Sequence, residues 1–294
     1  MEINREVKDR VFALLFGAQY KENALALYNA MNNTHYTDTD DLTITTIDDV
    51  IYLGMKNDCS FLIDNTLSIF EQQSSINPNM PVRGLLYFGR LYDQYISVNH
   101  LNRYGRKRLA LPTPQYIVLY NGAEPMDDIT TYYLSESLSG SKKSDVEVVA
   151  HVYNINPGHN EDLVKACKPL LGFSVLISRM REYQKKTSDL EKAATLAVNS
   201  CIEDGILMDF LIKHKAEVIG MCLTEYDEAE QRKMDRQEGL DEGLEKGLEK
   251  GLRSLIIALK RFTPDFNSLY TEVVNTPDYA DVSEEEVRRI YDEV

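Results

Sequence analysis

The sequence predicts an α/β fold in its first half, followed by an all-helical C-terminal region. Apolar residues near the N-terminus recur at helical spacing, which indicates helix. Short segments rich in β-branched and aromatic residues then follow between residues 42 and 155, which indicates strands. From about residue 159 the apolar spacing is helical throughout.

The predicted elements of the first half follow the order helix, three strands, helix, strand, strand. The first helix is interrupted near Gly17, and the second begins at Pro81, because proline is tolerated in the first turn of a helix. The strand over 113–122 is a nearly continuous apolar run, which predicts burial on both faces. The predicted helices cover 5–33 and 81–99, and the predicted strands cover 42–54, 59–63, 66–70, 113–122 and 145–155.

The C-terminal half contains a tandem repeat, EGLDEGLEKGLEKGLRS, in which each glycine is followed by leucine. On a helix, a period of four drifts by about 40° per repeat, so the Gly-Leu stripe winds around the axis. The repeat is either a solvated connector or an oligomerisation helix. The last helix is expected to be capped at Ser283. We expect four segments: an α/β domain over 1–157, a helical domain over 158–236, the repeat over 237–254 and a helical tail over 255–294.

Composition limits the possible classes. With 43% hydrophobic residues the chain can form a core, and no apolar run approaches the roughly 18 residues of a membrane span, so we expect a cytoplasmic protein without membrane contact. The four cysteines are far apart and lack zinc-ligand spacing, which indicates free and mostly buried thiols. The five histidines are equally scattered, which argues against a histidine-rich metal site.

The net charge of −15 is unfavourable for non-specific nucleic-acid binding. It is unevenly distributed, because residues 1–150 hold 13 basic and 19 acidic residues, a net charge of −6, and the remainder therefore has −9. A basic segment, NRYGRKRLALP, interrupts this background. It contains Arg103, Arg106, Lys107 and Arg108, which we interpret either as a backbone-contacting loop for DNA or as a solvated turn.

Two acids flank a predicted hairpin that turns at Asp64 and Asn65. If these two residues form the whole turn, the numbers of residues that face each other across the hairpin sum to 129. Asp58 then lies opposite Glu71. Gln73 projects from the same face as the acid pair. Opposed like charges need a cation, a shared proton or solvent, and Mg²⁺ favours one or two carboxylates plus waters and phosphate oxygens. Two solvated acids at a strand end are the alternative interpretation.

This pattern resembles the PD-(D/E)XK nuclease superfamily, and in particular the Rpn family of recombination-promoting, transposase-like nucleases. The resemblance extends over roughly residues 5–155 and rests on DRVFALLFG, NDCSFLI, FEQQS and RGLLYFGRLY in that order. It implies a restriction-endonuclease-like core, a central mixed sheet flanked by helices. It also implies a Mg²⁺-dependent or Mn²⁺-dependent DNA endonuclease associated with recombination, mobile elements or phage defence.

The resemblance also implies roles for individual residues. Asp58 and Glu71 match the metal-binding acids, and Gln73 stands where the family usually has a catalytic lysine. A neutral amide can only position water by hydrogen bonding. Asp9 is a candidate outer acid, or an ordinary exposed helix acid. Arg83 and Tyr87, one helical turn apart, are candidate phosphate contacts, or packing and surface residues.

Two functions of different classes remain open from the sequence. The acid pair favours the endonuclease. Gln73 and the acidic total charge favour a catalytically weak DNA-binding or interaction protein on a decayed nuclease core. In either case we expect DNA as a partner and a homo-oligomer assembled through the C-terminal helices and repeat.

Overall fold

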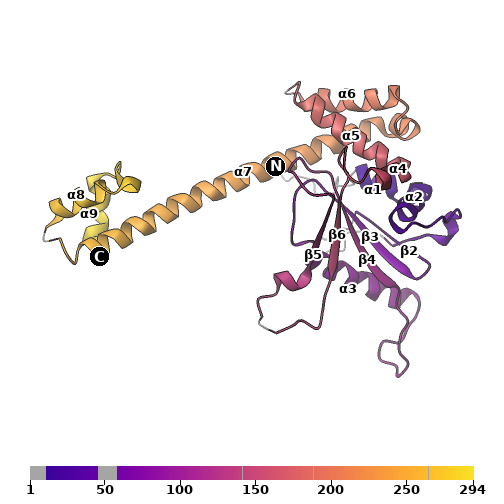
Figure 1. Ribbon diagram of the computed structural model, residues 1–294, viewed down its shortest axis with the longest axis horizontal. Helices are drawn as coiled ribbons and strands as arrows, with labels where there is room; N and C mark the ends of the chain where they lie inside the picture. The colour runs from indigo at the N-terminus through magenta and orange to yellow at the C-terminus, as the bar shows by residue number, and fades with distance from the viewer. Residues whose placement is uncertain (1–10, 46–57, 141, 188, 264) are drawn as a thin grey trace. The chain divides into compact units, whose positions relative to one another are not determined.

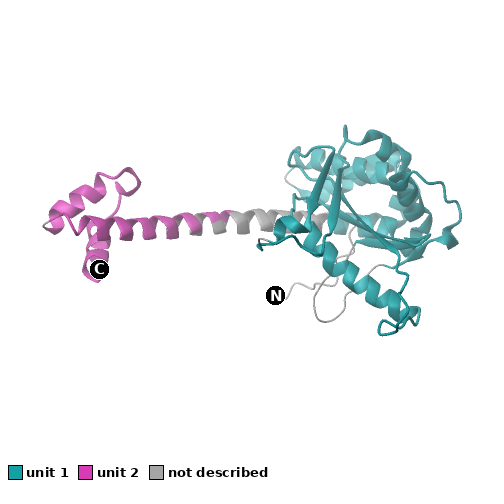
Figure 2. Ribbon diagram, turned by 60° about the horizontal axis from the view of Figure 1, so that its bottom comes forward, with its two compact units in different colours: residues 1–225 teal, residues 226–294 magenta. Residues whose placement is uncertain are grey.

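A computed structural model describes residues 11–45, 58–140, 142–187, 189–263 and 265–294, without the side chains of several residues between 222 and 245. The chain divides into two compact units, residues 1–225 and 226–294 (Figure 2). No helix in the described ranges is long and apolar enough to cross a membrane.

The first unit is built on a six-stranded mixed sheet with the order β1-β2-β3-β4-β6-β5 (Figure 1). Strands β1, β2 and β3 form an antiparallel meander, β4 is parallel to both β3 and β6, and β5 pairs antiparallel with β6. The predicted α/β class and the helical C-terminal region are therefore confirmed. The strands are β1 Thr43–Ile44, β2 Cys59–Ile63, β3 Thr66–Gln73, β4 Thr113–Tyr120, β5 Ile129–Tyr133 and β6 Val149–Asn154.

Helices cover both faces of this sheet and give it two apolar cores. The larger core packs one face against α1, α2, α4, α5 and α6, together with Phe210, Leu211, Val218 and Met221, and the smaller core packs the other face against α3 (Figure 1). On that face Gly84 lets α3 approach β4, since a Cβ at Gly84 would lie 2.7 Å from the Tyr116 ring. The helices are α1 Val11–Phe16, α2 Lys21–Asn32, α3 Met80–Val98, α4 Glu161–Ala166, α5 Lys168–Gln184 and α6 Leu190–Glu203.

Most of the predicted elements are present. The first predicted helix is interrupted after Phe16 by the short 3-10 turn Ala18–Tyr20. Tyr116 to Tyr120 of β4 are buried, as a strand covered on both faces requires. Of the strand predicted over 42–54, Thr43–Ile44 is observed, and most of the rest lies outside the described residues. The edge strand β5 was not predicted, although its Thr and Tyr residues are typical of strands.

The expected boundary at residue 157 does not separate two compact units. Helices α4 to α6 share one core with α1, α2 and the sheet. Leu170 and Phe173 of α5, for example, are buried in the same cluster as Phe12 and Phe70. The helical periodicity after residue 159 is real, but these helices cover a sheet face that would otherwise be exposed, so they complete the α/β unit.

The C-terminal unit has a separate apolar core. Helix α7, Met208–Leu259, contributes residues to both units and departs from helical dihedrals at His214 (φ −113°, ψ 20°). Its last turns pack with α8, Phe266–Val274, and α9, Glu284–Glu293. The Ser283 hydroxyl accepts a hydrogen bond from the Glu286 N–H at 3.2 Å, which confirms the predicted N-cap. The core of this unit consists of Leu252, Ile256, Leu269, Val273, Val287 and Ile290.

Candidate functional site

The β2–β3 hairpin forms in the predicted register. Asp64 and Asn65 both adopt left-handed backbone angles, with φ of 42° and 59°, as the central residues of a type I′ turn require. Ile63 pairs with Thr66, and Cys59 pairs with Phe70. Side chains alternate between the two faces, as this register requires: Cys59, Phe61, Ile63 and Phe70 lie in the larger core, whereas Leu67 and Ile69 lie in the smaller core under α3.

Asp58 and Glu71 meet at the open end of this hairpin. Strand β2 begins at Cys59, so Asp58 lies one residue outside the regular ladder. The Asp58 N–H donates to Glu71 Oε1 at 3.3 Å, and the Gln72 N–H donates to Asp58 Oδ2 at 2.7 Å. The two acids are thus linked through hydrogen bonds to the backbone. Glu71 is fully buried and Asp58 is half-buried.

Arg83 pairs with the buried Glu71 carboxylate. Its guanidinium Nη2 donates to Glu71 Oε2 at 2.6 Å, from the first turn of α3. The same group donates to the Tyr87 hydroxyl through Nη2 at 2.8 Å and through Nε at 3.2 Å, and it lies 5.6 Å from the centre of the Tyr87 ring. The cation that opposed carboxylates require is therefore provided in part by the protein itself.

The charges in this cluster change the proton affinities of their neighbours. Burial and the Glu71 charge raise the pKa of Tyr87, and Arg83 lowers it. The net result is a pKa of about 12, so the phenol is neutral at physiological pH. Burial by itself lowers the pKa of Arg83, but the charge of Glu71 and the Tyr87 hydroxyl raise it on balance. The guanidinium therefore stays charged beside Glu71.

The two glutamines after Glu71 point to opposite faces of β3. Gln73, on the same face as Asp58 and Glu71, is buried. Gln72 lies on the other face, where its Nε2 donates to Asn121 Oδ1 at 2.7 Å. Asn121 Nδ2 is buried and has no hydrogen-bond partner among the residues that the structure describes.

Sequence reasoning missed this second polar cluster at the carboxyl end of β4. Arg181 of α5 donates to the backbone oxygen of Asn121 and, at 3.0 Å, to Asn156 Oδ1. The available signal was the YNG sequence directly after a buried strand, because polar residues in that position lie at the carboxyl edge of a sheet.

The basic segment lies at the opposite end of the strands from the acids. It precedes β4, and the Thr113 N–H at the start of β4 donates at 2.7 Å to the Asn65 carbonyl in the hairpin turn. Thr66 and Glu71 are five residues apart along β3, which corresponds to about 16 Å. A single phosphate group therefore cannot contact both regions. Arg106, Lys107 and Arg108 are exposed, and Arg103 is paired with Asp93 at 2.5 Å.

The remaining candidate metal ligands and nucleophiles of the chain add little to this site. Asp9 lies outside the described residues. Cys59, Cys167 and Cys201 are free and buried, as predicted, and burial raises the pKa of Cys167 to about 12, which makes it a poor nucleophile. Within the described part of the chain, no group of three or more His, Cys, Asp and Glu side chains is arranged to hold a metal ion.

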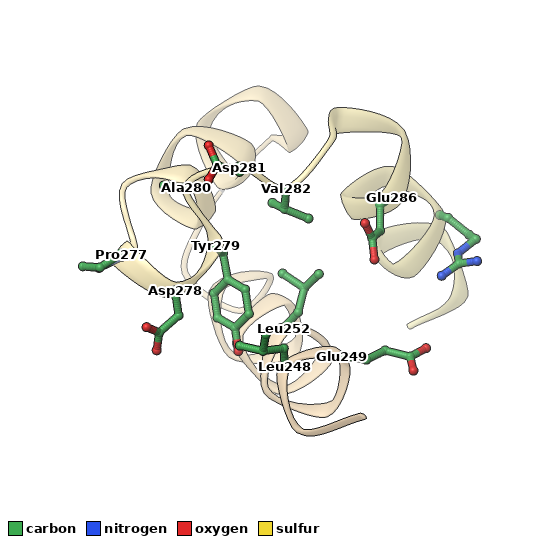
Figure 3. Close-up of a pocket in the computed structure, with 11 residues that line it drawn as sticks. Leu248, Glu249, Leu252, Pro277, Asp278, Tyr279, Ala280, Asp281, Val282 and Glu286 are labelled. Atoms are coloured by element: carbon green, nitrogen blue, oxygen red, sulfur yellow. The ribbon is translucent and has the colours of Figure 1, made fainter. Parts of the chain in front are cut away.

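A pocket of about 450 Å³ lies in the C-terminal unit between α7 and the segment that leads to α9 (Figure 3). Tyr279 points toward α7, where its hydroxyl fits against Gly251, and Leu252 lies beside it. Glu249, Asp278, Asp281 and Glu286 line the pocket, against one arginine, Arg289. This excess of acids is unfavourable for a phosphate ligand.

No protein-family model matches the chain, and no curated protein or solved structure shows significant similarity to it. The fold and the site by themselves define an α/β protein with a mixed sheet. At one end of its strands two acids lie together, and an arginine side chain from α3 pairs with one of them.

Proposed function

We propose that this protein is a Mg²⁺-dependent DNA endonuclease that hydrolyses phosphodiester bonds at the Asp58–Glu71 pair. The observation that supports the proposal best is the reciprocal hydrogen bonding between the backbone and the two acids at the open end of the β2–β3 hairpin. The biological setting that we propose is recombination, mobile elements or phage defence, on the basis of the resemblance to the Rpn family.

The topology also supports the proposal. The resemblance to the PD-(D/E)XK superfamily predicts the order helix, three-stranded meander, helix and strand. In this chain the corresponding elements are α1 and α2, which the sequence predicted as one interrupted helix, β1 to β3, α3 and β4. The sheet is mixed and has helices on both faces, which agrees with the same expectation.

The donor set fits Mg²⁺ in number and in chemistry. Asp58 and Glu71 would hold the ion, which favours one or two protein carboxylates and takes its other ligands from water and phosphate. The buried charge of Glu71 also needs a cation nearby. When bound, the metal supplies an activated water and polarises a phosphate oxygen. Mn²⁺ can replace Mg²⁺ at oxygen donors of this kind.

The residues around the acid pair have separate tasks in this proposal. The Gln73 amide orients the water by hydrogen bonding, and Arg83 contacts the phosphate with the part of its side chain that is exposed. Tyr87 keeps its proton and holds Arg83 through the hydroxyl. The basic segment from Arg103 to Arg108 contacts a more distant part of the polynucleotide backbone, since it lies at the other end of the strands.

Cleavage of supercoiled plasmid tests this function. The wild-type protein is expected to nick or linearise the plasmid with Mg²⁺ and to be inactive in chelator. Asp58→Asn keeps an acceptor for the Gln72 N–H but removes the charge, and we expect it to be inactive in both conditions. Asp162→Asn changes an exposed acid of α4 and is the matched control, with wild-type cleavage. Equal cleavage by wild type and Asp58→Asn would reject the assignment.

A second candidate function is that of a catalytically weak DNA-binding or interaction protein that assembles through the C-terminal unit. The observation that favours it is the exposure of Leu240, Leu244 and Leu248 along α7, next to glycines with open space around them. We include self-association through this surface in the proposal, because an exposed leucine stripe is typical of an interaction surface. DNA binding without cleavage in the plasmid assay would favour this second function.

A further inference from the structure

The ion pair between Glu71 and Arg83 occupies an oxygen that the proposed metal would also use. Glu71 is fully buried, and its Oε2 accepts the 2.6 Å hydrogen bond from Arg83. Removing the cation from a buried carboxylate strongly destabilises the folded protein. Glu71 therefore requires positive charge both with and without a metal, and in this structure Arg83 supplies it.

We infer that Arg83 is an internal counter-cation that a divalent metal displaces from Glu71, and that the displaced guanidinium then binds the phosphate of the substrate. This inference rests on the proposed metal site. Two positive charges on the same carboxylate group repel each other, so a divalent ion at Glu71 weakens the hold on Arg83. Metal binding thereby releases an anion-binding group close to the place where the phosphate arrives.

The surroundings of Arg83 allow this exchange. Its side chain is 32% exposed, whereas Glu71 is fully buried, so the guanidinium has a path toward solvent and the carboxylate has none. The other described partners of the guanidinium are the neutral Tyr87 hydroxyl and the Met80 sulfur, and neither holds a cation by charge. Arg83 also sits in the first turn of α3, where the helix dipole is unfavourable for a cation. Its position therefore depends largely on Glu71.

The exchange makes two predictions about binding. Arg83 lowers the affinity for metal in the absence of DNA, because the metal must compete with it. Arg83 also raises the affinity for metal once a phosphate diester is present, because the released guanidinium gains a partner. Metal and DNA therefore bind with positive coupling in the wild type, and the coupling is reciprocal.

Calorimetric titration of Mn²⁺ alone into the full-length chain tests the first part. We expect Arg83→Gln to bind Mn²⁺ about tenfold more tightly than the wild type. Its melting temperature should be lower than that of the wild type in chelator and should rise more on addition of Mn²⁺. Arg83→Lys keeps the charge and is expected to restore the weaker affinity. Arg179→Gln breaks an arginine–carboxylate pair of α5, which packs on the other face of the sheet, and should leave Mn²⁺ affinity unchanged.

The two proposals fail in distinguishable ways. If the wild type binds Mn²⁺ and Arg83→Gln binds it equally or more weakly, the exchange is overturned and the metal site stands. If neither folded protein binds Mn²⁺, the metal site itself fails, and the exchange fails with it. Should Arg83→Gln fold only with Mn²⁺ present, that dependence supports the exchange. Tyr87→Phe then provides the affinity measurement. It removes the two hydrogen bonds that help to hold Arg83 beside Glu71 but keeps the arginine, so tighter Mn²⁺ binding than in the wild type is expected.

A titration with duplex DNA, whose integrity is checked by electrophoresis after each measurement, tests the second part. In the wild type, saturating Mn²⁺ should strengthen DNA binding by about tenfold, and in Arg83→Gln this gain should be largely lost. An equal gain in both proteins would overturn the role of Arg83 in phosphate binding.

Discussion

The Asp58 N–H, directly before the start of β2, donates to Glu71 Oε1 near the end of β3 at 3.3 Å. This bond turns the Glu71 carboxylate across the open end of the hairpin, and Arg83 of α3 pairs with the same carboxylate. The electrostatic balance of the acid pair therefore includes a cation from another element, which changes what mutations at the pair should do.

Replacing Glu71 by Gln should lower the free energy of unfolding by about 1.5–3 kcal/mol in the absence of metal, because Arg83 loses a charge-assisted hydrogen bond. From like-charge repulsion alone, the opposite sign would be expected. Asp58→Asn should cost less, because its side-chain oxygen still accepts from the Gln72 N–H. Urea unfolding in chelator, followed by circular dichroism, measures both. A Glu71→Gln protein more stable than the wild type would show that repulsion outweighs the ion pair.

Alkaline pH should destabilise the first unit partly through Tyr87. The pKa of Tyr87 is raised to about 12 in the folded protein, so between about pH 10 and pH 12 the unfolded chain loses this proton and the folded chain keeps it. The contribution of Tyr87 to the free energy of unfolding is therefore fully present below about pH 10. Above that pH it falls by about 1.4 kcal/mol per pH unit. Tyr87→Phe should show a shallower loss across this range. Identical slopes for both proteins would contradict the raised pKa.

Two glycines of α3 should respond in opposite ways to alanine. A Cβ at Gly84 would lie 2.7 Å from the Tyr116 ring, and Gly84→Ala should cost about 1–3 kcal/mol through overpacking. Gly89 is exposed and has nothing within 4 Å, so Gly89→Ala should stabilise by about 0.5–1 kcal/mol through helix propensity. Thermal unfolding of the two variants provides the comparison. A stabilised Gly84→Ala would mean that α3 can move away from β4 at little cost.

The hairpin turn should be sensitive at Asn65, whose φ is 59°. Asn65→Ala should lower the free energy of unfolding by about 1 kcal/mol, because a Cβ without a compensating side-chain hydrogen bond disfavours the left-handed region. Asn65→Gly tolerates the same angles and should be neutral or stabilising. Since this turn fixes the register that brings Asp58 to Glu71, Asn65→Ala should also reduce cleavage more than Asn65→Gly does.

The C-terminal unit should control the oligomeric state. Light scattering of the full-length chain is expected to give a mass above that of a monomer, and truncation after Gln237 should give a monomer, since residues 1–225 have their own core. Leu244→Glu, at an exposed leucine of the repeat, should also shift the mass toward monomer. Leu196→Glu, at an exposed leucine of α6, is the control. If the full-length and truncated proteins contain the same number of chains per particle, the repeat is a connector.

The sequence by itself determined the elements that depend on local periodicity and turn chemistry. The register of the β2–β3 hairpin follows from the pair Asp64 and Asn65, because only a few residue types adopt two consecutive left-handed angles. Alternation along β2 and β3 then fixes which face each residue occupies, and hence that Glu71 faces α3 whereas Gln72 does not.

Only the tertiary structure decided what lies opposite those residues. The pairing of Arg83 with Glu71, and of Gln72 with Asn121, joins residues on different elements, and no sequence period relates them. The separation of the basic segment from the acids follows from β4 being parallel to β3, a property that local sequence does not encode. The union of α4 to α6 with the sheet has the same origin, since an amphipathic helix specifies that it needs an apolar partner but not which surface that partner is.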